Sequence, residues 1–277
     1  MNTLLLLSVA QIVIESLPVS SSAHVNLLEY LLKHAGISGV ARPEVFDHIL
    51  HVPTIVVVSA FLLSTYASLV VRGGVALLRP HRSLWRVRIL VRAKAMLLAQ
   101  LLLATLLTAC FYFSGLSAYL HSIVPPHLLY AAGFLWTALL FLRLTALPVD
   151  ARASNGFVTA CVVGCAQGLA LLPGVSRLGS TYCAARIMGL RPRQALSYSL
   201  LLQLILMLAG GVKALCTPLG KQAFAYLMIP HVALCVGVAA VGAFFLLRLV
   251  SSMAHTRTMY RWGYYLLCMA ALSFALL

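Results

Sequence analysis

Apolar residues run through most of the chain in long stretches that short polar segments separate. Six stretches are long enough to cross a bilayer as a helix, for which about 20 residues suffice. With approximate ends, they are residues 52–71, 95–118, 128–147, 195–216, 224–248 and 260–277. Two further apolar stretches, about 3–33 and 157–189, are interrupted midway by "PVSSS" and "PGVSRLGST". The pattern predicts six spanning helices and two broken ones.

Basic residues predict how these spans are oriented. The segment 72–94 is cytoplasmic by the positive-inside rule, because it carries Arg72, Arg79, Arg82, Arg86, Arg88, Arg92 and Lys94. Counting from this loop, 119–127, which has no Lys or Arg, lies outside, and both ends of 157–189 lie inside. Both ends of 3–33 lie outside by the same count. Each broken stretch is therefore predicted to be a re-entrant hairpin, and the two enter from opposite faces.

The two broken stretches also resemble each other in sequence. "AQIVIESLPVSSSAH" (10–24) aligns with "AQGLALLPGVSRLGST" (166–181), and each copy is followed by three spans, so the second copy is inverted. This is the pattern of an inverted-repeat membrane fold. We expect an all-α integral membrane protein with about six transmembrane helices and two re-entrant hairpins. It forms a single membrane domain, 1–277, with repeat halves of about 1–150 and 151–277.

The composition supports a membrane protein. Hydrophobic residues make up 62% of the chain and charged residues 9%, whereas a soluble domain has roughly 25% charged residues. The net charge of +15 then fits cytoplasmic loops and anionic lipid headgroups, and no soluble basic domain is present to bind nucleic acid. The seven cysteines lie in apolar segments, so we expect small buried apolar residues. The first 24 residues are expected to be mature protein, because no basic residue precedes their apolar run.

The interruptions supply the candidate chemistry. Irregular backbone at membrane depth must be surrounded by protein or line a wet cavity, so the two hairpin tips should meet near the midplane. Each tip exposes a helix N-terminus, which favours an anion. The hydroxyl and guanidinium groups at the tips would complete a phosphate site, and they are Ser20, Ser21, Ser22, Ser176, Arg177, Ser180 and Thr181.

Simpler roles exist for several of these residues. The serines at 20–22 are also suited to capping a helix, and Gly174 and Gly179 to close packing. Arg177 is harder to explain structurally, because a charge within a span is costly and the sequence has no acid after Asp150. An anionic ligand is its expected partner.

Glu15 and His24 flank the first tip. A carboxylate and an imidazole beside a phosphate can act as general acid, general base or nucleophile, and Glu15 is also suited to Mg²⁺ or Ca²⁺. The alternative for His24 is a structural role, which we also assign to the other eight histidines. Ser21 is the favoured attacking group, with His24 assisting. A nucleophilic His24 and an activated water remain the alternatives.

These motifs resemble those of the undecaprenyl-diphosphate phosphatase family, also known for bacitracin resistance. Its usual forms are E-G-x-T-E-F-L-P-V-S-S-T-G-H and P-G-x-S-R-S-G-A-T, to which "ESLPVSSSAH" and "LALLPGVSRLGST" are similar. The resemblance implies hydrolysis of undecaprenyl diphosphate to the monophosphate, which recycles the lipid carrier of peptidoglycan. It also implies a divalent cation (Mg²⁺ or Ca²⁺), with Glu15 as a ligand. The protein would lie in the bacterial plasma membrane, with both termini and the site towards the outer face.

Three departures indicate a divergent member. Gln11 stands where the first glutamate of the motif is usual, and Leu178 replaces the second serine of S-R-S-G. "FDHILHVPT" (46–54) only loosely resembles F-E-x-x-I-Q-L-G-S, with Pro53 in place of the glycine. Two other functions remain open at this point. One is a transporter or flippase of polyprenyl phosphate, which would not need both Glu15 and His24, and the other is an inactive relative. A homodimer is also left open.

Overall fold

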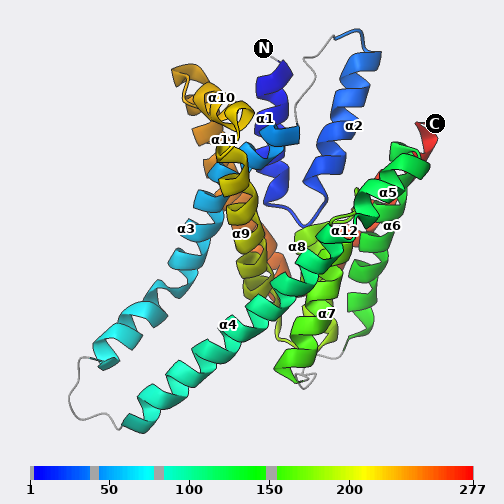
Figure 1. Ribbon diagram of the computed structural model, residues 1–277. Coiled ribbons are helices and arrows are strands. Elements are labelled where there is room, and N and C mark those ends of the chain that lie inside the picture. Colours follow the sequence, from blue (N-terminus) through cyan, green and yellow to red (C-terminus); the bar gives the residue numbers. More distant parts are fainter. Residues whose placement is uncertain (1–2, 38–43, 78–83, 148–154, 277) are drawn as a thin grey trace.

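The computed structural model describes residues 3–37, 44–77, 84–147 and 155–276 (Figure 1), and this part of the chain is helical without a strand. The helices are α1 (Thr3–Glu15), α2 (Ser21–His34), α3 (Glu44–Leu77), α4 (Leu84–Phe113), α5 (Leu116–Ile123), α6 (Pro126–Arg143), α7 (Gly156–Leu169), α8 (Arg177–Ile187), α9 (Pro192–Leu215), α10 (Pro218–Leu227), α11 (Pro230–Thr256) and α12 (Arg261–Ala275). Short 3₁₀ turns lie at Leu144–Ala146 and Thr258–Tyr260. Four helices begin at a proline, which suits the first turn because no hydrogen bond is lost there.

Within the described residues, five segments are long and apolar enough to cross a membrane, and they are Phe46–Thr65, Val91–Ile123, Pro126–Ala146, Pro192–Leu215 and Pro230–Thr256. They overlap five of the six spans expected from the sequence. The sixth, 260–277, contains α12, which has only 15 residues. The all-α membrane class is therefore confirmed, while the span count stays a prediction.

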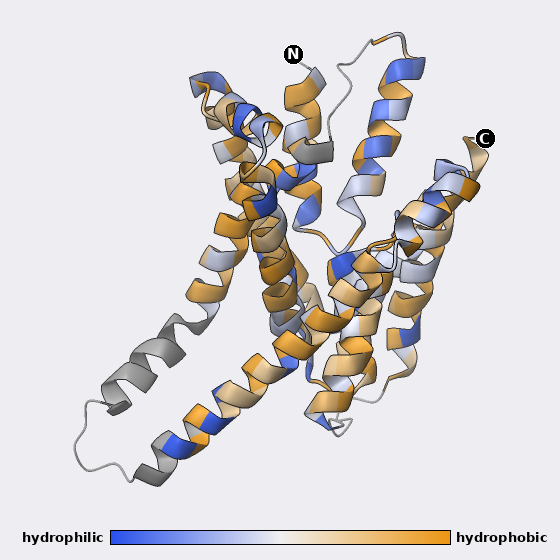
Figure 2. Ribbon diagram, in the orientation of Figure 1, coloured by the Kyte–Doolittle hydropathy of each residue, from blue (hydrophilic) through white to orange (hydrophobic). Residues whose placement is uncertain are grey.

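The outer faces of the helices are apolar, as lipid contact requires. On α11 large exposed apolar side chains recur every three or four residues, and they are Leu234, Val238, Val241, Phe245 and Leu249. The other face of α11 is buried and includes Ala239, Ala243 and Leu247. Figure 2 shows apolar residues along much of the length of the long helices. An exposed apolar surface of this extent belongs in lipid rather than in water.

The cysteines correct one sequence expectation. Cys183 is buried and Cys235 is half-buried, but the other five are exposed, and they are Cys110, Cys161, Cys165, Cys216 and Cys268. The expectation of buried cysteines is wrong for these five. The physical reason is that a cysteine in an apolar helix can face either the lipid or the protein core, and the apolar sequence alone does not show which.

The two interrupted stretches form helical hairpins. The chain leaves helix between Glu15 and Ser21, and again between Leu169 and Arg177, where the sequence places its proline, serine and glycine residues. In Figure 1, α1 and α2 meet near mid-height after α1 descends from the upper end, and α7 rises from the lower end towards α8. Both marked termini lie at the upper end.

The helix contacts have a regular pattern. Helix α1 packs on α11 and α7 packs on α4, while α3 packs on α9 and α6 on α12. Helix α8 lies against both α6 and α9. Three of the four half-helices, α1, α7 and α8, are thereby packed against long helices, as irregular backbone at membrane depth requires.

Small residues let the two hairpin tips approach each other. A Cβ atom at Gly179 would lie 2.9 Å from the carbonyl oxygen of Pro18 and 2.9 Å from the Phe141 ring. Gly174 has φ +84°, a conformation that favours glycine, and its Cα faces the backbone of Tyr130. The close-packing role considered for these glycines is confirmed. The boundary expected near residue 150 lies outside the described residues.

Candidate active site

A small polar cavity of about 40 Å³ lies where the two tips meet. Its lining comes from the first tip (Glu15, Leu17, Val19, Ser20, Ser21 and Ser22), from the second tip (Ala170, Val175, Ser176, Arg177 and Leu178), and from Gln203 of α9. Six of the sequence-predicted residues are therefore brought together in one place: Glu15, the serines at 20–22, Ser176 and Arg177.

Glu15 is the centre of this arrangement. It is the last residue of α1, its side chain is only 2% exposed, and its charge lies at the helix end where the macrodipole is unfavourable to an anion. Arg177 Nη2 of α8 donates a 2.8 Å hydrogen bond to Oε1. His51 Nδ1 of α3 lies 3.2 Å from Oε2, and Gln11 Nε2 donates to the same oxygen at 3.2 Å. Polar groups from three helices thus stabilise one buried carboxylate.

The partner of Arg177 differs from the expectation. The sequence offers no acid near Arg177, so an anionic ligand was the expected partner, but the fold supplies Glu15 from 162 positions earlier. The Arg177 side chain remains 26% exposed and lines the cavity. A guanidinium has five N–H donors, so the bond to Glu15 leaves donors for a phosphate.

The serine at the N-cap of the first tip does not cap the helix, so its hydroxyl remains available to a ligand. Ser20 is the N-cap residue of α2, yet its side chain makes no capping hydrogen bond, and its Oγ lies 3.5 Å from Ser22 Oγ. Ser21 Oγ accepts a long hydrogen bond, 3.4 Å, from Gln11 Nε2. The hydroxyls therefore face the same cavity as the N-terminal amides of α2, which is the arrangement that binds an anion.

The second tip contributes fewer groups than expected. Ser176 is the N-cap of α8, where its Oγ accepts from the Gly179 amide at 3.0 Å, and its own amide donates to Thr137 Oγ1. Ser180 and Thr181 lie behind the tip and do not line the cavity. Thr181 Oγ1 donates to the Arg177 carbonyl at 2.8 Å, and Ser180 Oγ is buried without a partner among the described residues.

His24 also lies outside the cavity lining. Its Nδ1 is 2.6 Å from the Ser20 carbonyl and its Nε2 is 2.8 Å from the Tyr265 hydroxyl. The ring packs edge-on against Phe134 and is stacked with Tyr265. Both ring nitrogens are occupied, so this conformation does not contain the expected pairing of His24 with Ser21.

Two residues of the site were missed by the sequence interpretation. His51 was assigned a structural role, although it lies in "FDHILHVPT", the segment with the loose motif resemblance. Gln203 is a polar residue within the apolar span α9. It is 5% exposed, and its Oε1 has no partner in the described part of the chain. A lone amide in an otherwise apolar segment was the available signal for Gln203.

The donor set does not match a divalent cation. Among the described residues, Glu15 is the only carboxylate in the lining, and its two oxygens face Arg177 and His51. Mg²⁺ and Ca²⁺ are bound by several oxygen ligands in which carboxylates predominate. Within the described ranges, no three His, Cys, Asp or Glu residues are grouped so that they could hold a metal ion.

The chain is similar over most of its length to known proteins. The family model described as "Bacitracin resistance protein BacA" matches residues 4–272. An undecaprenyl-diphosphatase of Rubrobacter xylanophilus is 31% identical over 276 residues, covering 98% of this chain and 96% of the relative. One from Thermotoga maritima is 28% identical over 273 residues, covering 98% of each. One from Treponema denticola is 29% identical over 207 residues, covering 74% of this chain and 72% of the relative. This multi-pass membrane protein therefore belongs to the bacitracin resistance protein BacA family.

Proposed function

We propose that this protein is a membrane phosphatase that hydrolyses undecaprenyl diphosphate to undecaprenyl phosphate and inorganic phosphate. The observation that carries the proposal is the cavity itself. It combines Arg177, the serine hydroxyls and the start of α2 at the one place where two hairpin tips meet. The identity of the lipid substrate is inferred from the family and from the name that the relatives share. The reaction recycles the lipid carrier used for the cell wall.

The cavity suits the terminal phosphoryl group of the lipid. Arg177 binds the non-bridging oxygens as a planar fork, and the Ser20 and Ser22 hydroxyls donate to the same group. Overall, the oxygen of a water molecule bonds to the terminal phosphorus and the bridging P–O bond breaks. The bridging oxygen leaves with the lipid monophosphate. Positioning and charge neutralisation are the main contributions that phosphoryl transfer requires from a protein.

Ser21 is the attacking group in this proposal: its Oγ bonds to the terminal phosphorus as the bridging P–O bond breaks, and its proton leaves with the lipid monophosphate. A water molecule then hydrolyses the phosphoserine, which releases inorganic phosphate and restores the Ser21 hydroxyl. It lines the cavity beside Arg177, whereas His24 does not. His24 accordingly acts at a distance, by fixing the first turn of α2 through the Ser20 carbonyl. Attack by a water molecule in place of Ser21 is the alternative that the trapping experiment described below distinguishes.

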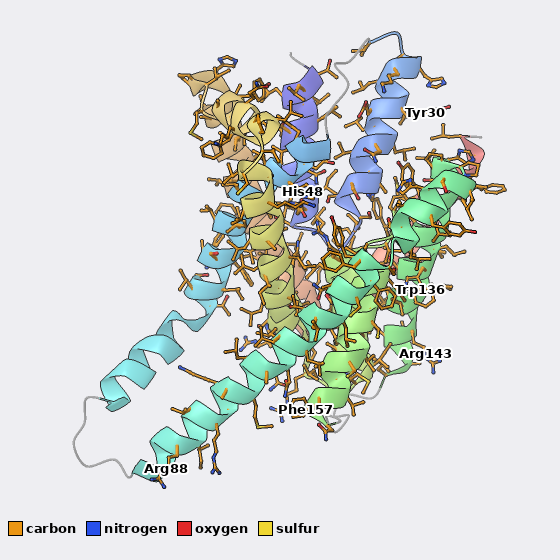
Figure 3. All side chains as sticks on the ribbon, viewed as in Figure 1. Tyr30, His48, Arg88, Trp136, Arg143 and Phe157 are labelled. Atoms are coloured by element: carbon orange, nitrogen blue, oxygen red, sulfur yellow. The ribbon has the colours of Figure 1, made fainter. Side chains whose placement is uncertain are left out.

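We also propose the inverted-repeat topology, with six spans and two re-entrant hairpins. In this topology α1 corresponds to α7, α3 to α9, α4 to α11 and α6 to α12. The contact pattern supports it, because exchanging corresponding helices converts the α1–α11 contact into the α7–α4 contact. The same exchange leaves the α3–α9 and α6–α12 contacts unchanged. Arg88 and Arg143 lie towards the end of the molecule opposite Tyr30 (Figure 3). With that basic end in the cytoplasm, the termini lie at the outer face of the plasma membrane.

Transport of polyprenyl phosphate without bond cleavage is not favoured, because the relatives share the name of a diphosphatase. The test is to incubate the purified protein in detergent with undecaprenyl diphosphate. We expect one inorganic phosphate and one lipid monophosphate for each substrate consumed. Binding of the lipid without phosphate release would contradict hydrolysis and support transport.

A further inference from the structure

His51 is a buried polar group that the proposed reaction does not use. It belongs to α3, outside both hairpins, yet its Nδ1 lies 3.2 Å from Glu15 Oε2, and its side chain is 7% exposed. Its ring also contacts that of His48 one turn earlier, with centroids 5.9 Å apart. Figure 3 shows His48 close to α1 and α9, the region from which α3 reaches the site. The 3.2 Å approach is an ion-pair distance rather than a hydrogen bond, because Nδ1 has no hydrogen-bond partner among the described residues. A buried imidazole is costly unless a group such as this carboxylate compensates it.

Two sequence departures meet at the same carboxylate oxygen. Gln11 stands at a usual glutamate position, and His51 aligns with the glutamine of F-E-x-x-I-Q-L-G-S. In the structure both side chains approach Oε2 of Glu15, each at 3.2 Å. Compared with the usual motif forms, position 11 on α1 carries an amide in place of a carboxylate, and position 51 on α3 carries an imidazole in place of an amide, within one cluster. The two departures are coupled in space, although they are 40 positions apart.

The exchange changes how negative charge is balanced. Two carboxylates at positions 11 and 15 would repel each other, and a divalent cation between them would relieve the repulsion. A single carboxylate at 15 lies here between a guanidinium at 2.8 Å and an imidazole at 3.2 Å. Its charge is already neutralised by protein groups, and its oxygens are no longer open to a cation.

We propose that His51 is a positioning residue for Glu15, and that His51 and Arg177 together fill the place of a divalent cation. The protein then releases phosphate without an added cation. This inference rests on the proposed phosphatase function. His51 does not touch the substrate: it orients the carboxylate from α3 while Arg177 reaches both the carboxylate and the phosphate.

The first experiment measures phosphate release from undecaprenyl diphosphate with EDTA, and after EDTA is replaced by excess Mg²⁺ or Ca²⁺. We expect the unmodified protein to keep its rate within about twofold in all three conditions. We expect His51→Gln to lose at least about tenfold in kcat, since losing a group that only orients another functional side chain typically costs about 10–100-fold. The exposed His231→Gln variant is the control and should be unchanged.

The double variant Gln11→Glu/His51→Gln restores both usual residues of the motifs. We expect it to recover activity relative to His51→Gln, and to lose that activity in EDTA and regain it with Mg²⁺ or Ca²⁺. A purely structural role of His51 would not move the cation dependence. An EDTA-sensitive unmodified protein that Mg²⁺ restores would overturn the proposal, as would full activity of His51→Gln.

A binding measurement separates this inference from the function on which it rests. Mn²⁺ is titrated into each purified protein in detergent, and bound ion is measured by electron paramagnetic resonance. We expect no stoichiometric binding by the unmodified protein and one site in the double variant. Stoichiometric binding that Glu15→Gln abolishes would overturn the inference, whether or not phosphate is released. Absence of phosphate release under every condition would instead overturn the proposed function.

Discussion

The Glu15 carboxylate decides most of what this site can do. It is buried at the end of α1 and held by Arg177 from α8 and by His51 from α3. Removing one member of a buried ion pair typically costs about 3–5 kcal/mol, because the other charge is left without compensation. Arg177 is partly exposed to the cavity, which lowers that cost and lets a substrate phosphate replace the lost charge.

Glu15→Gln tests the carboxylate with little change in shape. The amide keeps the size and some hydrogen bonding, but it neither positions Arg177 by charge nor accepts a proton. We expect phosphate release to fall by at least about 100-fold, a usual loss for one electrostatic group of an active site. The size-exclusion profile should be unchanged. Glu29→Gln is the control, because Glu29 pairs with Lys33 on α2. Retention of most activity in Glu15→Gln would contradict the assignment.

The attacking group is tested by trapping a labelled phosphoryl group at low pH and mapping the labelled peptide. Ser21 lines the cavity and His24 does not, so we expect acid-stable label in the peptide that contains Ser21. Acid-labile label at His24 would favour histidine. Absence of label in a protein that releases phosphate would favour water.

At the residue scale, the sequence identified the groups that come from the two motifs. Polar and charged residues beside a proline within an apolar stretch are locally recognisable, so the sequence alone points to Glu15, Ser21, Ser176 and Arg177. His51 could not be assigned in this way, because its contact with Glu15 depends on the packing of α3 beside α1. The salt bridge of Arg177 to Glu15 was missed for the same reason.

At the element scale, the two hairpins are the features that the sequence predicts best. Each break contains a proline and is followed by a serine that begins the next helix or precedes it. The position of one tip against the other has no such local signal. It depends on Gly179, which allows the backbone of Pro18 to come into contact with α8.

Gly179→Val therefore tests whether the tips are packed as described. The new side chain would meet the Pro18 carbonyl and the Phe141 ring, neither of which can move freely. Overpacking of this kind costs about 1–3 kcal/mol, so we expect a lower Tm in detergent together with loss of activity. Gly237→Val is the matched control on α11, where a Cβ atom meets nothing within 4 Å. Equal Tm values for the two variants would show that the tips do not touch.

At the scale of the whole molecule, charge and hydropathy predicted an all-α membrane protein but not its packing. The pairing of α1 with α11 and of α7 with α4 follows from side-chain shape across distant segments. The sequence repeat "AQ…P…VS" is too short to specify these contacts. The membrane class is confirmed, whereas the six-span count and the single-domain organisation stay predictions.

Topology is tested with single cysteines in a cysteine-free background and an impermeant thiol reagent on intact cells. Cysteine at Ser122, which lies at the end of the apolar segment Val91–Ile123 and in the stretch 119–127 that has no Lys or Arg, should react from outside, as should cysteine at Ser38. Cysteine at Ser83, between the basic residues of 72–94, should react only after the membrane is opened. Ser38 and Ser83 lie outside the described residues. Labelling at Ser83 in intact cells would contradict the inverted repeat.

The central claim is that the cavity between the two hairpin tips performs the hydrolysis, and Arg177 tests it most directly. Phosphate release from undecaprenyl diphosphate is compared for Arg177→Ala, Arg177→Lys and the exposed control Arg193→Ala, which lies at the start of α9. We expect a fall of about 100-fold or more for Arg177→Ala. We expect poor rescue by lysine, which keeps the charge but loses the planar fork, and no change for Arg193→Ala. Near-normal turnover of Arg177→Ala in a folded protein would place the active site elsewhere.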